Sequence, residues 1–191
     1  GEGTKLSEKD FLKSALNISL ISLRKLFWYT IPTRMVGYIT VISEFTKQEL
    51  LKHVSVEPGK VRVIHDCISP LITYTPKDFN QNKPTILQIG TKENKNLPVL
   101  IEALEGILCK LLIVGPLSKE QILMLNGRKI EYENYCDIEF TEVMDLYRSA
   151  DILSLISTYE GFGVPIIEAQ AFGRPVITSN IGPMPEVAGD A

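Results

Sequence analysis

The sequence predicts an α/β protein whose principal domain is a doubly wound parallel sheet. Three observations lead to this prediction. From residue 85 onward, short apolar segments alternate with segments of helical periodicity. Most of these segments carry apolar residues at consecutive positions rather than at every second position, as expected of strands buried on both faces. Finally, 45% of the 191 residues are hydrophobic, which is enough to build a core in a domain of this length. Strand–helix alternation of this kind produces a parallel sheet covered by helices on both faces.

The elements of this domain follow one another closely. The predicted strands are 85–89, 111–114, 130–132, 152–156 and 176–178. The predicted helices are 97–108, 119–125, 142–149 and 165–172, with a short candidate at 185–187. Ligands of doubly wound sheets bind outside the carboxyl ends of the strands. The loops after Ile89, Val114 and Ile156 are therefore where a functional site is expected.

The first part of the chain has a different pattern. Apolar residues at helical spacing predict a helix over 5–29, and β-branched runs predict short strands at 38–43 and 61–65. Residues 44–53 are expected to be helical, with Ser43 as the N-cap. These elements read as a partial N-terminal α/β segment.

The sequence therefore predicts three regions. Residues 1–65 are expected to be the tail of an N-terminal domain, and 66–84 a hinge and linker, because prolines and asparagines cluster near both ends of 73–84. Residues 85–191 are expected to form the ligand-binding domain, without its last elements.

Composition and charge exclude several classes of protein. With 20 Lys and Arg against 23 Asp and Glu, and a net charge of −3, the chain lacks the basic excess of a nucleic-acid-binding protein. Its uncharged stretch at 14–23 is about half of the ~20 residues that a membrane span needs. Cys67, Cys109 and Cys136 have neither zinc-ligand nor disulfide-framework spacing, so no metal is expected and a reducing, cytoplasmic setting fits best.

The most informative local motif is the segment 159–169, YEGFGVPIIEA, which follows a predicted buried strand and opens a helix. Gly161 and Gly163 allow a sharp turn and a close approach of the backbone to a ligand. The free N–H groups at the helix start form an anion site. Glu160 lies in the loop and Glu168 is expected in the first helical turn, so both carboxylates are expected to face one crevice, where they can accept hydrogen bonds from hydroxyl groups.

This segment resembles the E-x7-E motif of retaining glycosyltransferases with the two-domain GT-B architecture, family 4 in particular. The motif is formed by Glu160 and Glu168, and the phrases at 147–152, 173–179 and 185–191 are also typical of that family. The resemblance extends from about residue 38 to the end of the chain. It implies a Rossmann-like fold for the principal domain.

The resemblance also implies roles for the residues of the motif. Glu160 would be the catalytic residue that contacts the hydroxyls of the donor sugar, and Glu168 would accept hydrogen bonds from the ribose of the nucleotide. Gly161, Phe162 and Gly163 would belong to the donor-binding loop, with the N–H groups of Phe162 and Gly163 facing the donor.

A second loop corresponds to the phosphate loop of the family. It spans 90–96, where Lys95 matches the lysine that neutralises the leaving diphosphate, a role for which a fixed cation is suited. Thr91 stands where many members carry an arginine, a departure that bears on phosphate affinity. Residues 132–136 fall where family members recognise the base.

The function implied by the resemblance is that of a retaining, hexosyltransferase-type glycosyltransferase. The donor would be a nucleotide-diphosphate sugar, used without a metal ion, and the acceptor a glycan or lipid-linked hydroxyl. The full-length protein could make peripheral contact with a membrane. Because the acceptor side is expected to be missing, the isolated chain is expected to be inactive. Two alternatives remain open at this point: a non-catalytic nucleotide-binding module, and a GT-B enzyme of another kind, such as a sugar-nucleotide epimerase or a phosphorylase.

Overall fold

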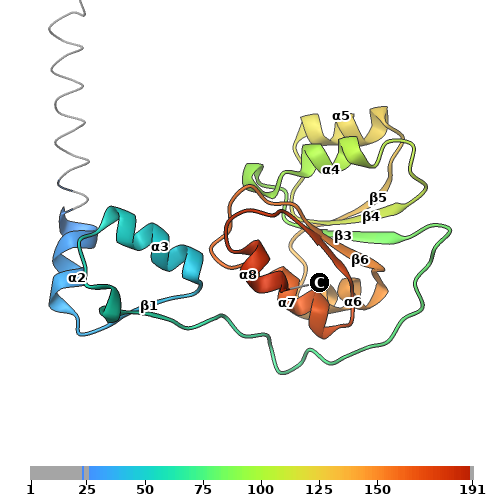
Figure 1. Ribbon diagram of the computed structural model, residues 1–191. Helices are drawn as coiled ribbons and strands as arrows, with labels where there is room; N and C mark the ends of the chain where they lie inside the picture. Colours follow the sequence, from blue (N-terminus) through green and yellow to red (C-terminus); the bar gives the residue numbers. More distant parts are fainter. Residues whose placement is uncertain (1–22, 24–25, 190–191) are drawn as a thin grey trace, which may run out of the picture. The chain divides into compact units, whose positions relative to one another are not determined.

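The computed structural model describes residue 23 and residues 26–189, which fall into two compact units (Figure 1). The smaller unit comprises the described residues up to Val41 together with residues 47–64. The larger unit comprises residues 42–46 and the described residues from His65 onward. No helix in the described part of the chain is long and apolar enough to cross a bilayer.

The smaller unit contains two short parallel strands, β1 (Ile39–Val41) and β2 (Val61–Val63), in which Ile39 pairs with Val61. Its helical elements are a π-helical turn (Leu26–Thr30), α2 (Ile31–Met35) and a 3-10 turn (Pro58–Lys60), together with α3 (Glu44–His53) from Lys47 onward. The first three residues of α3 belong to the larger unit.

Three of the elements predicted for this region have different bounds in the structure. The strand predicted over 38–43 is confined to 39–41. Most of the helix predicted over 5–29 lies outside the described residues, but its described end continues to Met35 instead of stopping at Tyr29. Pro32 lies in the first turn of α2, where proline's missing N–H is tolerated and the helical run is not broken. The strand predicted over 61–65 ends at Val63.

The larger unit is built on a five-stranded parallel sheet, which confirms the predicted fold class. Its strands are β3 (Thr85–Ile89), β4 (Lys110–Val114), β5 (Glu131–Tyr135), β6 (Ile152–Leu155) and β7 (Val176–Thr178). The strand order is β5-β4-β3-β6-β7, with every neighbouring pair parallel. The chain moves outward from β3 in one direction and then returns to β6 on its other side. The switch point, where such sheets bind ligands, therefore lies between β3 and β6.

Helices cover both faces of this sheet. Figure 1 shows α4 (Leu97–Ala103) and α5 (Lys119–Gly127) on one face. On the other face lie α6 (Phe140–Ser149), α7 (Val164–Ala171) and α8 (Met184–Ala188). A separate apolar cluster fills each interface, and fully buried members include Leu97, Ile101 and Leu125 on the first face and Tyr147, Ile166 and Phe172 on the second.

Several element boundaries differ from the predicted ones. The helix predicted over 97–108 ends at Ala103, because the chain turns at once through Gly106, whose φ of 76° is one that glycine adopts without strain. The strand predicted at 130–132 is 131–135. It is an edge strand in which Glu131 and Glu133 pair with lysines, so it lacks the apolar signature of the inner strands. The helix predicted at 142–149 starts two residues earlier, and β6 stops one residue before the predicted end.

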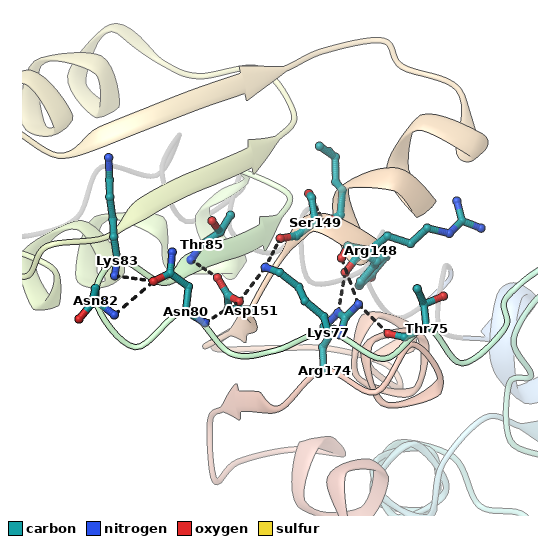
Figure 2. Close-up of polar contacts among 12 residues, drawn as sticks. Thr75, Lys77, Asn80, Asn82, Lys83, Thr85, Arg148, Ser149, Asp151 and Arg174 are labelled. Atoms are coloured by element: carbon teal, nitrogen blue, oxygen red, sulfur yellow. Dashed lines mark hydrogen bonds and ion pairs between the residues drawn. The ribbon is translucent and has the colours of Figure 1, made fainter.

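The linker predicted at 66–84 contains neither helix nor strand but is firmly attached to the sheet (Figure 2). The Asp151 carboxylate is almost fully buried and accepts hydrogen bonds from Lys77 Nζ at 2.6 Å, the Thr85 N–H at 2.7 Å and the Asn80 N–H at 3.2 Å. Burial alone would raise the pKa of Asp151, but these donors outweigh it and hold the pKa below its ordinary value.

A second anchor is the buried guanidinium of Arg174, which donates to the backbone carbonyls of Thr75, Tyr147 and Arg148 (Figure 2). The carbonyl oxygens of Tyr147 and Arg148 lie at the end of α6 and accept no hydrogen bond within the helix, so Arg174 supplies their donors. The two anchors fix the linker along the edge of the sheet where the strands begin.

Candidate functional site

The candidate site is built from the loops that leave β3 and β6, at the switch point of the sheet. After β6, the chain turns through Gly161 and Gly163 into α7. Gly163 has a φ of 106°, and a Cβ there would lie 3.2 Å from Ile166 Cδ1. Only glycine meets both constraints without strain, so the structure explains this glycine of the motif by local geometry.

The turn leaves backbone donors free at the start of α7, an eight-residue helix. The N–H groups of Phe162, Gly163 and Val164 have no hydrogen-bond acceptor among the residues that the structure describes. Consecutive free N–H groups at a helix N-terminus favour a bound anion, both as donors and through the helix dipole. These N–H groups are therefore free to donate to an anion at the start of α7, and the anion site itself stays a prediction.

The orientation of this turn is set by two hydroxyl groups that the sequence reasoning did not assign to the site. Ser43 Oγ lies 2.8 Å and Thr46 Oγ1 3.0 Å from the carbonyl oxygen of Gly161, and both hydroxyls can donate to it. In a trans peptide the C=O and the following N–H point in opposite directions. Holding the Gly161 carbonyl therefore directs the N–H of Phe162 away from these hydroxyls. Ser43 also caps α3, accepting from the Thr46 N–H at 3.0 Å, as predicted.

The predicted catalytic residue Glu160 and the predicted phosphate-loop residue Lys95 meet in an ion pair. Lys95 Nζ lies 2.6 Å from Glu160 Oε1, and the two side chains are 18% and 14% exposed. The Ser157 hydroxyl, which is fully buried, donates to the same carboxylate oxygen at 2.6 Å. Ser157 was not among the predicted site residues.

The loop that carries Lys95 is tied to the loop after β6. The Thr158 N–H donates to the Asn94 carbonyl at 2.8 Å, and Asn94 Nδ2 donates to the Tyr159 carbonyl at 3.0 Å. Lys95 ends a 3-10 turn (Glu93–Lys95), and Asn96 then takes a left-handed conformation before α4 begins. These contacts bring the two loops together at the switch point.

Thr91 has a different environment from that of Lys95. It is 9% exposed, its hydroxyl donates to the Pro116 carbonyl, and its own carbonyl accepts from Gln121 Nε2 at 2.9 Å. Thr91 thus joins the loops after β3 and β4, and its hydroxyl proton is used inside the protein. A cavity of about 550 Å³ lies beside it, lined in part by Lys92 and Ser118.

Glu168 does not lie in the first turn of its helix, and that prediction was wrong. Because α7 begins at Val164, Glu168 is its fifth residue. Its Oε2 accepts from the buried Tyr147 hydroxyl at 2.7 Å. Burial raises the pKa of Glu168, and the bond from Tyr147 opposes that rise. Burial and the Glu168 carboxylate raise the pKa of Tyr147 well above its ordinary value.

The structure therefore joins Glu160 to Lys95 and places Glu168 against another partner. No hydrogen bond or ion pair within residues 26–189 connects the two glutamates. No group of three or more Cys, His, Asp and Glu side chains in that part of the chain could hold a metal ion.

Comparisons with known proteins identify the family of this chain. Residues 75–191 match the family described as glycosyl transferases group 1. The chain is 28% identical over 178 residues to the O-antigen chain mannosyltransferase B of Escherichia coli, covering 80% of this chain and 46% of that protein. It is 23% identical over 172 residues to the D-inositol 3-phosphate glycosyltransferase of Mycolicibacterium gilvum, covering 80% of this chain and 39% of that protein.

Solved structures show the same fold. Anabaena Alr3699/HepE, determined in complex with UDP and glucose, superposes with a TM-score of 0.71 at 16% identity, covering 86% of this chain and 50% of that one. WaaG, a glycosyltransferase involved in lipopolysaccharide biosynthesis, gives 0.67 at 19% identity, covering 78% and 46%. The chain spans about half the length of these relatives or less. With its Rossmann-like sheet and the match over residues 75–191, the chain belongs to the group 1 family of GT-B glycosyltransferases.

Proposed function

We propose that the larger unit is the donor-binding half of a retaining glycosyltransferase. The enzyme would transfer a hexose from a nucleoside diphosphate sugar to a hydroxyl of a glycan or lipid-linked acceptor. The observation that carries this proposal is the Lys95–Glu160 ion pair, with 2.6 Å between Nζ and Oε1. Glu160 lies two residues before Phe162, the first of the free N–H groups at the start of α7.

Each of these groups suits one part of such a donor. The Glu160 carboxylate accepts hydrogen bonds from sugar hydroxyls, and the free N–H groups of Phe162 and Gly163 donate to phosphate oxygens. The Lys95 ammonium has three N–H donors and uses one of them in the hydrogen bond to Glu160, so it can also donate to the diphosphate. Glu168 uses one oxygen on Tyr147 and has the other for the ribose hydroxyls.

The reaction requires little covalent chemistry from the protein. The bond between the anomeric carbon and the diphosphate oxygen breaks, and the electron pair leaves with the diphosphate. The acceptor oxygen bonds to the anomeric carbon on the same face, and its proton passes to the departing diphosphate. Lys95 and the N–H groups stabilise the charge that develops there, and electrostatic stabilisation of this kind is usually the largest single contribution to catalysis.

The relatives support the substrate class. One is named as a mannosyltransferase of the O-antigen chain, and one solved neighbour was determined with UDP and glucose. The cysteines Cys67, Cys109 and Cys136 are all free, which supports a cytoplasmic location.

The test is a calorimetric titration of the chain with UDP, GDP and ADP, followed by UDP-glucose and GDP-mannose. We expect one nucleotide to bind, and Lys95→Ala to weaken its binding by about tenfold, the loss of roughly one hydrogen bond to a charged group. Lys83→Ala is the matched control, since Lys83 lies at the opposite edge of the sheet and pairs with Glu131. Equal binding by the Lys95 variant and the unaltered chain would contradict the proposal.

The sugar part of the donor separates an enzyme from a nucleotide-binding module. If Glu160 contacts the sugar, Glu160→Ala weakens binding of the nucleotide sugar more than binding of the nucleotide alone. A module that holds only the nucleotide gives the same affinity for both ligands, with and without Glu160.

A further inference from the structure

We propose that Gln88 is a positioning residue for Lys95, because its buried amide holds both ends of the loop that carries the lysine. The inference rests on the proposed function, since it concerns how Lys95 is presented to the diphosphate. It adds a residue that lies outside the motif and does not itself reach the ligand.

Gln88 lies in the central strand β3 and is fully buried, with 0% of its surface exposed. Its Nε2 donates to the Gly90 carbonyl at 3.1 Å and to the Lys95 carbonyl at 3.3 Å. A primary amide has two N–H bonds, so each hydrogen serves one carbonyl. One carbonyl group belongs to Gly90, the first residue of the loop, and the other belongs to Lys95, the residue that Gln88 would position.

The other atom of the amide shows why a glutamine is present. Gln88 Oε1 is buried and has no hydrogen-bond partner among the described residues. An unpaired buried oxygen destabilises the fold, and an apolar side chain would avoid that cost. Rotating the amide would place Oε1 against two carbonyl oxygens, so the donor contacts fix its orientation. The hydrogen bonds to Gly90 and Lys95 therefore explain why a glutamine stands at position 88, which apolar packing alone does not explain.

The side chain of Lys95 is fixed as well as its backbone. A Cβ at Gly90 would lie 3.0 Å from Lys95 Cγ and 3.1 Å from its Cε, so the lysine stem lies directly across this glycine. At its far end, Nζ is held by Glu160. Gln88 supplies the remaining support, at the Lys95 carbonyl. A cation fixed in this way stabilises developing charge without first having to reorganise.

The neighbouring strand supplies a matched control. Ser154 in β6 is the register partner of Gln88, is 1% exposed, and also has an unpaired oxygen. It makes no side-chain hydrogen bond to the loop. Ser154→Ala therefore changes a buried polar group beside Gln88 without touching the support of Lys95.

The experiment compares Gln88→Met, Ser154→Ala, Lys95→Ala and the double variant Gln88→Met/Lys95→Ala. Methionine is unbranched and similar in volume to glutamine, so the core stays filled. The titrants are UDP, GDP and ADP, measured by calorimetry. We expect Gln88→Met to weaken nucleotide binding by about fivefold to tenfold and Ser154→Ala to leave it unchanged. We also expect the double variant to bind no more weakly than Lys95→Ala, because contacting groups are non-additive.

Backbone ¹⁵N relaxation provides a readout that needs no ligand. Order parameters at residues 92–96 should fall in Gln88→Met and stay unchanged in Ser154→Ala. Unchanged order parameters in Gln88→Met would overturn the inference. Full additivity in the double variant would overturn it as well, since Gln88 would then act without Lys95, and in both cases binding by the unaltered chain would leave the proposed function standing. If the unaltered chain binds none of the three nucleotides, the proposed donor site fails, and the positioning role fails with it.

Discussion

Replacing Asp151 by asparagine tests the anchoring of the linker to the sheet. The substitution keeps the shape of the side chain but removes its charge. It also replaces one acceptor oxygen with an NH₂ group, which would then face the donors that surround Asp151 (Figure 2). The side chain is 1% exposed and lies 2.6 Å from Lys77 Nζ, whose side chain is 29% exposed. We expect a large loss of stability.

The expected size follows from burial. Removing one member of a buried ion pair costs about 3–5 kcal/mol, and because Lys77 still reaches water the lower end, about 3 kcal/mol, applies. For a chain of this length, such a loss lowers the melting temperature by about 6–12 °C. Lys83 offers a contrast in the same linker, since its ion pair with Glu131 has the same 2.6 Å separation but side chains that are 39% and 55% exposed. Lys83→Met should therefore cost less than about 1 kcal/mol.

The assay is urea unfolding followed by far-ultraviolet circular dichroism at several pH values. In the folded chain the pKa of Asp151 lies below its ordinary value of 3.8, because the hydrogen bonds from Lys77, Thr85 and Asn80 outweigh the effect of burial. The stabilisation is therefore complete above that ordinary value, and it is lost as the pH falls through the lowered one. The difference between the unaltered chain and Asp151→Asn should shrink below about pH 4. Equal losses in Asp151→Asn and Lys83→Met, or a difference that does not depend on pH, would show that the buried ion pair of Asp151 does not anchor the linker.

Two further predictions concern the candidate site. In Tyr147→Phe, the Glu168 carboxylate loses a hydrogen bond that favours its charged form, so its pKa should rise further, as measured by carboxyl ¹³C titration; an unchanged pKa would count against the contact. In Gly90→Ala, a Cβ at a φ of 88° would also displace the Lys95 stem, so stability should fall by about 1–3 kcal/mol and nucleotide binding should weaken. Gly106→Ala, at a φ of 76° with open space around it, should reduce stability alone, and equal effects on binding would contradict the role given to Gly90.

The sheet could be predicted closely because its inner strands are buried on both faces. Apolar runs marked the inner strands β3, β4 and β6 to within one residue at each end. The edge strand β7 was also predicted with its observed bounds. The edge strand β5 was predicted at 130–132 instead of 131–135, because Glu131 and Glu133 make ion pairs there and the strand lacks an apolar run. The helix after β3 ended early at a turn through Gly106, since apolar periodicity does not show where a chain leaves the helical conformation.

The candidate site was predictable where a side chain lies in a local motif. Glu160 and Lys95 were both identified, and the structure joins them. The supporting residues were not, because Ser43, Thr46 and Gln88 act on backbone carbonyls. A carbonyl group is present at every residue and leaves no signature in the sequence. A buried glutamine within an otherwise apolar strand was the one available signal.

Binding of the nucleotide at the switch point of the sheet can be tested directly by mapping the nucleotide on the chain by NMR. Backbone amide shifts would be followed while the nucleoside diphosphate that binds in the calorimetric titration is added. We expect the largest changes at Phe162, Gly163 and Val164 and in the loop 90–96. Changes concentrated instead in the cavity along β7, lined by Arg174 and Val176 among others, would contradict binding at the switch point.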